Sequence, residues 1–230
     1  MRLIVTLLCL VGLVLGGCGR QDEASGAGGA AAPSSTAEEP GTGAETRGEC
    51  RPAELPASRP DGNEPRPREA LDPQRQHDVT VQTNCGSFTI RLDLDTAPKT
   101  AASFVALARS GFYEDTVFHR IVPGFVIQGG DPKGDGSGGP GYKTVDKPPR
   151  DARYTKGVVA MAKAGPEAPG TAGSQFFVVT RDDVGLPPEY AVLGKVTDGL
   201  DVVELIGTLG NEAEEPTETV VVEKMTVRSS

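Results

Sequence analysis

Histidine, cysteine and tryptophan are scarce in this chain of 230 residues, which has two histidines, four cysteines and no tryptophan. The histidines are His77 and His119, and Ser174 in TAGSQFF does not lie in a G-x-S-x-G turn. No convincing Ser-His-Asp set can be formed, so a nucleophilic hydrolase is poorly supported. No cysteine pair is accompanied by suitably spaced cysteines or histidines, and no metal site is expected.

The signals of several other ligands are also missing. The glycine-rich stretch GGDPKGDGSGGPG lacks the G-K-[S/T] ending of a phosphate-binding loop and does not open a helix. Its Asp131 and Asp135 lack the spacing and the final glutamate of a calcium-binding EF-hand. We interpret the stretch as a mobile surface loop. The net charge is −9, and no basic patch could follow a phosphate backbone, so nucleic acid is not an expected partner. We expect no cofactor.

The N-terminus has the pattern of an export signal. An apolar run from Leu3 to Leu15 follows Arg2 and is too short to span a bilayer as a helix. The following Gly16-Gly17-Cys18 resembles, with Leu15, the lipobox of bacterial lipoproteins, in which the signal is cut before a cysteine that then carries lipid. We therefore expect a signal peptide over residues 1–17 and lipidation of Cys18. The protein would then be anchored to the outer face of the cytoplasmic membrane. An ordinary signal peptide that happens to carry a cysteine is the alternative.

Two cysteines, Cys50 and Cys85, remain in the mature chain. A pair of cysteines in an exported protein favours a disulfide, and two free thiols are the alternative.

Composition divides the rest of the chain into two parts. Residues 18–76 are rich in Gly, Ala, Pro, Ser and Glu, and their apolar side chains are too few to offset the entropy of ordering. We predict a lipidated, disordered tether there and one folded domain over residues 77–230.

Short strands dominate the predicted domain. Residues 77–96 alternate apolar and polar side chains on both sides of Asn84-Cys85-Gly86, which predicts a β-hairpin. Thr96 is a candidate N-cap for a helix that begins near Pro98 and ends at Gly111. Several short apolar runs, a second short helix in LDVVELIGTL and a last strand follow. This order predicts a mostly-β antiparallel barrel or sandwich with a helix covering each open end.

One arginine lies in an otherwise apolar run, FHRIVPGFVIQGGDP. A partly buried arginine is costly unless it has a partner or a function, so Arg120 is a candidate functional residue. Rotation about an X-Pro bond needs no acid or base, because its barrier comes from resonance between the nitrogen and the carbonyl group. A fixed cation that donates to the proline nitrogen would favour the twisted amide.

This run and two others, GVVAMAKAGPEAPGTAGSQFFVVT and YAVLGKVTDGLDVVELI, resemble the cyclophilin-type peptidyl-prolyl isomerases. The similarity extends from about Val79 to the C-terminus, and the order and spacing of the blocks are highly specific. The resemblance implies an eight-stranded antiparallel β-barrel capped by two α-helices. It also implies proline-containing unfolded or extended polypeptides as substrates, and we expect a monomer.

The resemblance also implies the site. Arg120 would be the catalytic cation, Phe125 would line the proline pocket, and Gln128 would position Arg120 and the substrate. The substrate-binding positions would be Val126, Ala162, Lys163, Gln175, Phe177, Leu186 and Tyr190. From the residues alone, simple core packing would be the favoured explanation of the two phenylalanines, and the resemblance reverses that preference. His119 is expected to be a structural residue beneath the site.

Three features depart from the best-known members of the family. The segment GPEAPGTAGS is about three residues longer, Tyr190 replaces a common histidine, and Gly185 stands where many eukaryotic members have a tryptophan that contacts the drug cyclosporin. These departures affect substrate preference and drug binding more than catalysis. The leading hypothesis is an isomerase that helps exported proteins to fold. A chaperone that only holds proline-containing segments is the main alternative, and a ligand-binding lipoprotein is a third.

Overall fold

The computed structural model describes residues 48–230, in which eleven strands and two helices form a mostly-β fold. The predicted signal peptide, Cys18 and the tether up to residue 47 lie outside the described residues. The elements are β1 (His77–Thr83), β2 (Gly86–Leu92), α1 (Pro98–Arg109), β3 (Thr116–Val117), β4 (Arg120–Val122), β5 (Val126–Gly129), β6 (Thr144–Val145), β7 (Val158–Met161), β8 (Thr171–Ala172), β9 (Phe176–Val179), β10 (Val192–Asp198), α2 (Leu200–Gly207) and β11 (Val221–Ser229).

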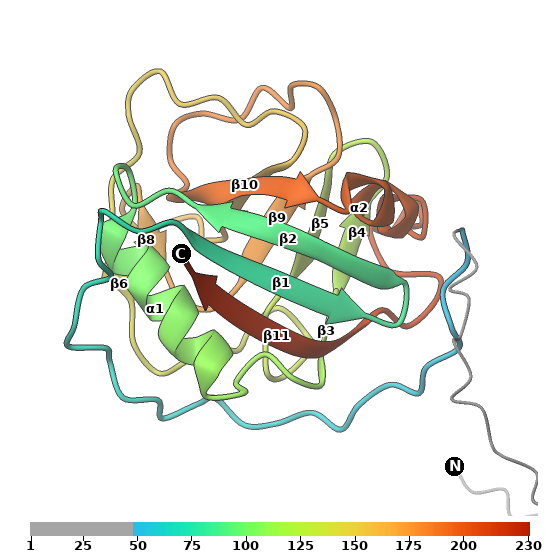
Figure 1. The fold of residues 1–230 in the computed structure, drawn as a ribbon. Coiled ribbons are helices and arrows are strands. Elements are labelled where there is room, and N and C mark those ends of the chain that lie inside the picture. Colours follow the sequence, from blue (N-terminus) through green and yellow to red (C-terminus); the bar gives the residue numbers. More distant parts are fainter. Residues whose placement is uncertain (1–47) are drawn as a thin grey trace, which may run out of the picture. The chain divides into compact units, whose positions relative to one another are not determined.

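Nine of these strands form one antiparallel sheet in the order β3-β11-β1-β2-β10-β7-β9-β5-β4. Its edge strands, β3 and β4, are separated by only two residues in the chain, so the sheet curls back toward itself. Strands β6 and β8 form a separate pair. The predicted fold class is confirmed, but the main sheet has nine strands instead of eight. The helices α1 and α2 lie at opposite ends of the curled sheet (Figure 1).

The first hairpin forms where the alternation of side chains predicts it. Val79 and Val81 of β1 are fully buried, and the strand pairs with β2 across a turn at Asn84 and Cys85. The Asn84 side chain fastens this turn, because its amide nitrogen donates to the carbonyl oxygens of Arg51 and Thr219. A buried amide with several partners fixes the local backbone.

The start of α1 differs from the prediction. Its N-cap residue is Ala97, which has no side-chain oxygen, and the hydroxyl group of Thr96 donates instead to the carbonyl group of Val192. The free N–H group of Thr100 in the first turn donates to the carboxylate of Asp146, 2.7 Å away. A side chain from a distant segment therefore caps this helix.

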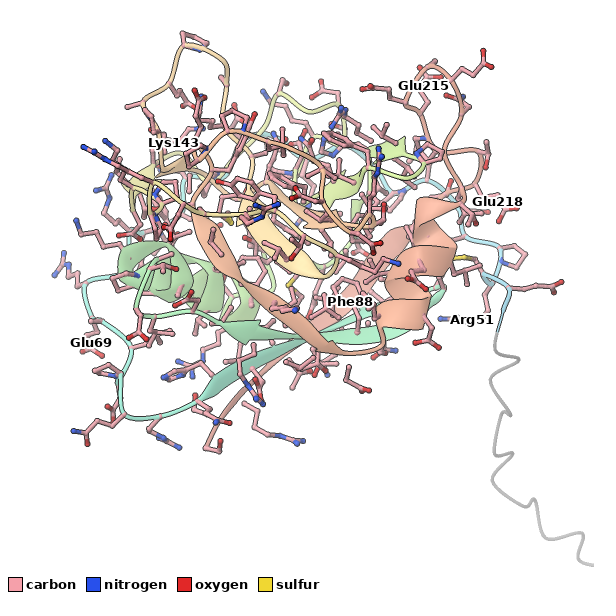
Figure 2. All side chains as sticks on the ribbon, turned by 90° about the horizontal axis from the view of Figure 1, so that it is seen from above. Arg51, Glu69, Phe88, Lys143, Glu215 and Glu218 are labelled. Atoms are coloured by element: carbon pink, nitrogen blue, oxygen red, sulfur yellow. A yellow bond between two sulfur atoms is a disulfide. The ribbon has the colours of Figure 1, made fainter. Side chains whose placement is uncertain are left out.

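The sheet has an apolar cluster on each face. In β9, Phe176 and Val178 belong to the main core, whereas Phe177 and Val179 belong to a smaller cluster on the other face. This split follows from the two-residue period of a strand. The main core includes Phe88, whose side chain lies inside the fold (Figure 2). The smaller cluster carries the candidate site.

Residues 48–76 correct the predicted tether. The structure shows that this segment, here called the strap, has almost no regular secondary structure but follows the domain surface before β1 (Figure 1). Cys50 forms a disulfide with Cys85, which confirms the predicted pair. Arg59 donates to the carbonyl oxygens of Phe112 and Glu114 at 2.7 and 2.9 Å. Hydrogen bonds and the Cys50–Cys85 disulfide hold the strap against the domain. Disorder was predicted from the low content of apolar side chains, and neither kind of contact depends on that content.

No helix within residues 48–230 has the length and apolar character needed to cross a membrane.

Candidate active site

The register of three neighbouring strands brings the predicted site residues together. Arg120 of β4 pairs with Gln128 of β5, and Gln128 pairs with Phe177 of β9. Ala160 of β7 follows in the same row, because it pairs with Phe177. Residues that are directly opposite in adjacent strands share one face of a sheet. The cation, the amide and the aromatic ring therefore lie side by side on the outer face of the sheet.

The guanidinium group of Arg120 has two partners. Its Nε atom donates to Oε2 of Glu214 at 2.7 Å, and one Nη atom donates to Oε1 of Gln128 at 3.3 Å. Within residues 48–230 the second Nη atom makes no hydrogen bond. A guanidinium group has five N–H donors in a planar fork. The arrangement fixes two edges of this fork and leaves donors available for a ligand.

The hydrogen bonding continues away from Arg120. Nε2 of Gln128 donates to Oε1 of Gln175 at 3.1 Å, and Nε2 of Gln175 donates to the carbonyl oxygens of Gly136 and Gly138, both at 2.9 Å. Every amide in this series both donates and accepts, so each bond polarises the next. The series connects the arginine to the glycine-rich stretch.

The glycine-rich stretch is more organised than the mobile loop that was predicted. The carboxylate of Asp131 is fully buried and accepts hydrogen bonds from the backbone N–H groups of Lys133, Asp135 and Gly136. Gly130 has φ +83°, and a Cβ atom there would lie only 2.7 Å from the Ser174 carbonyl oxygen. A residue without a side chain is required at this close approach.

The strap contacts the same stretch from the other side. The backbone N–H groups of Gly62 and Glu64 donate to the carbonyl oxygens of Gly139 and Pro140, and the carboxylate of Asp61 lies 3.0 Å from the ammonium group of Lys133. Glycine-rich loops gain little from apolar burial, so these polar contacts have a large share in ordering this one.

Apolar residues form the other half of the site. Val126 and Phe177 are buried at 2% and 4% exposure, and Phe125, Leu186 and Tyr190 pack against them while remaining partly exposed. The rings of Phe177 and Tyr190 meet edge to face with their centroids 5.4 Å apart. Buried rings with partly exposed neighbours can hold a compact apolar group such as a proline ring.

Tyr154 supports this cluster and was not predicted from the sequence. Its ring is fully buried, and its hydroxyl group donates to the carbonyl oxygen of Tyr190 at 2.7 Å and accepts from the N–H group of the same residue at 3.0 Å. Burial raises the pKa of Tyr154 above its usual value. The neutral hydroxyl group thus fixes the backbone that carries Tyr190.

Ala162 and Lys163 border a cavity of about 310 Å³ that also includes Gln128 and Gln175. The Lys163 side chain is only 3% exposed, and its ammonium group lies 3.1 Å from the carboxylate of Glu189. It also lies 5.8 Å from the centre of the Tyr190 ring. The charge of Lys163 is therefore engaged within the protein by Glu189 and by the face of the Tyr190 ring.

His119 lies next to Arg120, partly buried. Neither ring nitrogen has a hydrogen-bond partner within residues 48–230. Burial lowers the pKa of His119, although the nearby charges of Asp131 and Asp135 oppose the change. The structural role expected for His119 stays a prediction.

The sequence did not indicate Glu214 either. It lies 94 residues after Arg120, in the acidic run NEAEEPTE, which has the composition of a solvated loop. No local pattern links an exposed acid to a partner at this separation, so only the fold could reveal the pair.

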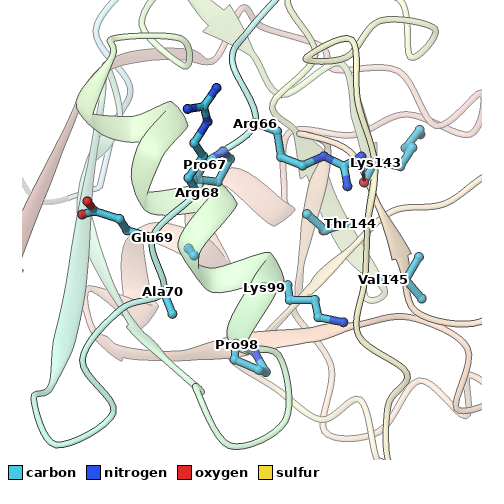
Figure 3. Close-up of a pocket in the computed structure, with 11 residues that line it drawn as sticks. Arg66, Pro67, Arg68, Glu69, Ala70, Pro98, Lys99, Lys143, Thr144 and Val145 are labelled. Atoms are coloured by element: carbon cyan, nitrogen blue, oxygen red, sulfur yellow. Dashed lines mark hydrogen bonds between the residues drawn. The ribbon is translucent and has the colours of Figure 1, made fainter.

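A second cavity, of about 450 Å³, shares Lys143 with the first as a lining residue (Figure 3). The strap, the start of α1 and the β6 strand form its walls, and Arg66, Lys99 and Lys143 contribute positive charge. It contains none of the predicted site residues.

Comparison with known proteins identifies similar sequences and folds. The family model described as cyclophilin type peptidyl-prolyl cis-trans isomerase/CLD matches residues 78–227. The peptidyl-prolyl cis-trans isomerase A of Mycobacterium tuberculosis is 41% identical over 170 residues, covering 65% of this chain and 91% of that protein. The peptidyl-prolyl cis-trans isomerase-like 1 of Neurospora crassa is 40% identical over 157 residues, covering 66% and 94%.

Solved structures give the same match. The crystal structure of a cyclophilin-type peptidyl-prolyl cis-trans isomerase from Cryptosporidium parvum has 32% sequence identity and a TM-score of 0.62, covering 67% of this chain and 99% of that chain. A second structure of that protein, determined in the presence of the dipeptide Ala-Pro, has a TM-score of 0.61.

Proposed function

The chain belongs to the cyclophilin-type peptidyl-prolyl cis-trans isomerases, and from this premise we propose that it accelerates the folding of exported proteins while anchored by a lipid on Cys18 to the outer face of the cytoplasmic membrane. The proposed isomerase activity rests on one observation, the row of Arg120, Gln128 and Phe177 across three neighbouring strands. In this row a donor cation lies on the same face of the sheet as a buried aromatic ring and its apolar neighbours.

The proposed reaction requires no covalent step. The apolar cluster around Phe177 holds the proline ring, and the free N–H donors of Arg120 point to the prolyl nitrogen as its lone pair emerges in the twisted amide. A donor that is fixed in advance stabilises the twisted form more than either planar form, because only the twisted nitrogen can accept. The barrier, about 18–20 kcal/mol without a catalyst, falls accordingly.

Cyclophilins bind proline-containing peptides, as the Ala-Pro dipeptide used with the Cryptosporidium relative illustrates. We assign Phe125, Val126, Leu186 and Tyr190 to contacts with the proline ring. Gln175 and the backbone of Ala162 and Lys163 border the adjoining cavity and are assigned to the extended chain that precedes the proline.

The location rests on different observations. The lipobox-like Leu15-Gly16-Gly17-Cys18 supports lipidation, and the Cys50–Cys85 disulfide favours an oxidising compartment. Several acyl chains on one cysteine would give a stable anchor, at about 0.8 kcal/mol for each buried CH₂ group.

A protease-coupled tetrapeptide assay on the purified full-length protein tests the activity. An isomerase should increase the rate of cis-to-trans conversion in proportion to enzyme concentration. A holding module would bind the peptide without increasing that rate, and this result would favour the chaperone alternative.

Membrane anchoring has a separate test in cells. Wild-type protein should incorporate labelled palmitate and partition into the detergent phase. The Cys18→Ala variant should either lose both properties or keep its uncleaved signal peptide. Processed Cys18→Ala protein in the detergent phase would contradict the lipid anchor.

A further inference from the structure

Glu214 occupies an unusual backbone position in the loop between α2 and β11. Its φ angle is +64°, in the left-handed region that glycine adopts most readily. The loop is held by Asn211, whose side-chain oxygen accepts from the N–H groups of Ala213 and Glu215. The Glu214 carbonyl oxygen accepts from the N–H group of Ile121 at 3.0 Å. The loop is thereby joined to β4, the strand that carries Arg120.

The side chain of Glu214 uses this position to reach Arg120. Its Oε2 atom lies 2.7 Å from Nε of the guanidinium group, while Gln128 accepts from one Nη atom. Two contacts on different edges of a planar group fix its rotation, whereas one contact would leave it free to turn about the bond. Within residues 48–230 the other Nη atom has no partner. Its two N–H donors therefore remain for the substrate.

We propose that Glu214 is a positioning residue for catalysis, which acts by holding the guanidinium group of Arg120 in the orientation that isomerisation requires. The proposal rests on the assignment of Arg120 as the catalytic cation. Glu214 does not touch the proline itself. Its effect should appear in turnover and little in peptide affinity, because the apolar cluster that binds the ring is unchanged.

Stability cannot be the main role of this pair. The side chains of Arg120 and Glu214 are 33% and 49% exposed, and exposed ion pairs contribute little to stability. The left-handed backbone at Glu214 also opposes folding for any residue with a Cβ atom. A glutamate at this position is therefore costly for the backbone but useful for Arg120.

The variant Glu214→Gly separates the effect of Glu214 on stability from its effect on turnover. Glycine accepts the +64° φ angle without strain, so the melting temperature should be equal to or higher than that of wild type. We expect the turnover number to fall about tenfold, with peptide affinity within twofold, because a misplaced catalytic group loses rate before it loses binding. NMR exchange measurements on a proline peptide, with the full-length protein, give both quantities.

Glu215 provides a matched control. It is the next residue in the loop, it is exposed, and its side chain has no ion pair or hydrogen bond within residues 48–230; it points away from the fold (Figure 2). Glu215→Ala removes the same charge and should change turnover less than twofold. A tenfold loss in this variant would mean that loop charge in general is responsible, and it would overturn the proposal.

A double-mutant cycle tests whether Glu214 acts through Arg120. In an Arg120→Lys background, which lacks the Nε donor, Glu214→Gly should lower turnover by less than twofold. A further tenfold loss there would overturn the proposal, as would wild-type turnover in the single variant. If the wild-type protein itself shows no isomerase activity, the proposed function fails instead, so the two failures are distinguishable.

Discussion

The amide nitrogen of Gln128 lies 3.1 Å from the amide oxygen of Gln175, and this contact joins the candidate catalytic group to the glycine-rich loop. On one side Gln128 accepts from Arg120, and on the other Gln175 donates to two carbonyl groups of the loop. The orientation of Arg120 therefore depends on a loop that is itself ordered by Asp131 and the strap.

Replacing Gln175 should show this dependence. Gln175→Leu keeps the approximate volume of the side chain but removes the acceptor for Gln128 and both contacts to the loop. We expect kcat/KM to fall about five- to tenfold, while the free energy of unfolding decreases by about 1–4 kcal/mol for the three lost hydrogen bonds. Equal kcat/KM in the two proteins, measured by the tetrapeptide assay, would show that the series of amides has no role in catalysis.

The Cys50–Cys85 disulfide should stabilise the domain. It closes a loop with a sequence separation of 35 residues. The chain-entropy estimate for such a loop is about 3–4 kcal/mol, and residual structure in the unfolded chain lowers the realised value. Cys50→Ser should therefore lower the free energy of unfolding by up to about 3 kcal/mol in urea titrations.

Reduction provides the control for that experiment. Wild-type protein with a reducing agent should match Cys50→Ser, and the agent should not change the variant further. Two thiols that can be alkylated without reduction, in protein isolated from its native compartment, would contradict the disulfide.

Cyclosporin should bind this protein more weakly than it binds the tryptophan-bearing relatives. Gly185 offers neither the indole N–H donor nor the ring contact, a loss of about 1–3 kcal/mol. The backbone opposes the introduction of a tryptophan at this position. Gly185 has φ +64°, and any residue with a Cβ atom there would lower the stability of the fold by about 1–2 kcal/mol. Gly185→Trp should thus recover only part of the affinity. Nanomolar inhibition of the unmodified protein would contradict this prediction.

Acid should weaken the fold through His119 before it affects most carboxylates. Because burial lowers the pKa of His119, the unfolded chain binds a proton more readily than the folded chain does. The free energy of unfolding should fall as the pH decreases through about 6.5, the usual histidine pKa. His119→Gln should flatten the dependence between pH 7 and 5 in urea titrations. An unchanged slope in the variant would show that another group is responsible.

The fold could be predicted where local pattern and tertiary structure agree. Alternation in β1 and β2 placed the first hairpin, and the block around Arg120 indicated both the cation and its partner Gln128. The resemblance also singled out Phe177, the second of two adjacent phenylalanines and the one that the strand period places on the outer face.

The features that the sequence did not predict depend on contacts between segments that are distant in the chain. The order of the strap comes from backbone hydrogen bonds to the glycine-rich loop and from Cys85, and amino-acid composition carries no signal for either. Tyr154 and Glu214 act on residues 36 and 94 positions away. No spacing in the sequence indicates such pairs.

The central claim is that Arg120 supplies the donor for isomerisation. The apolar cluster of Phe125 and Phe177 remains in Arg120→Ala, so proline peptides should still bind within a few-fold of wild type. Loss of one preorganised donor should reduce turnover by about 10²–10³-fold, or about 3–4 kcal/mol in the barrier. Arg120→Lys should rescue only part of this loss, because an ammonium group cannot reproduce the planar fork.

The most direct measurement compares the isomerisation rates of wild-type and Arg120→Ala proteins in the tetrapeptide assay, with a thermal melt of each to show that both are folded. We predict a folded variant with about 10²–10³-fold lower kcat/KM. A folded Arg120→Ala protein that isomerises at the wild-type rate would contradict the assignment and favour a module that only holds proline-containing segments.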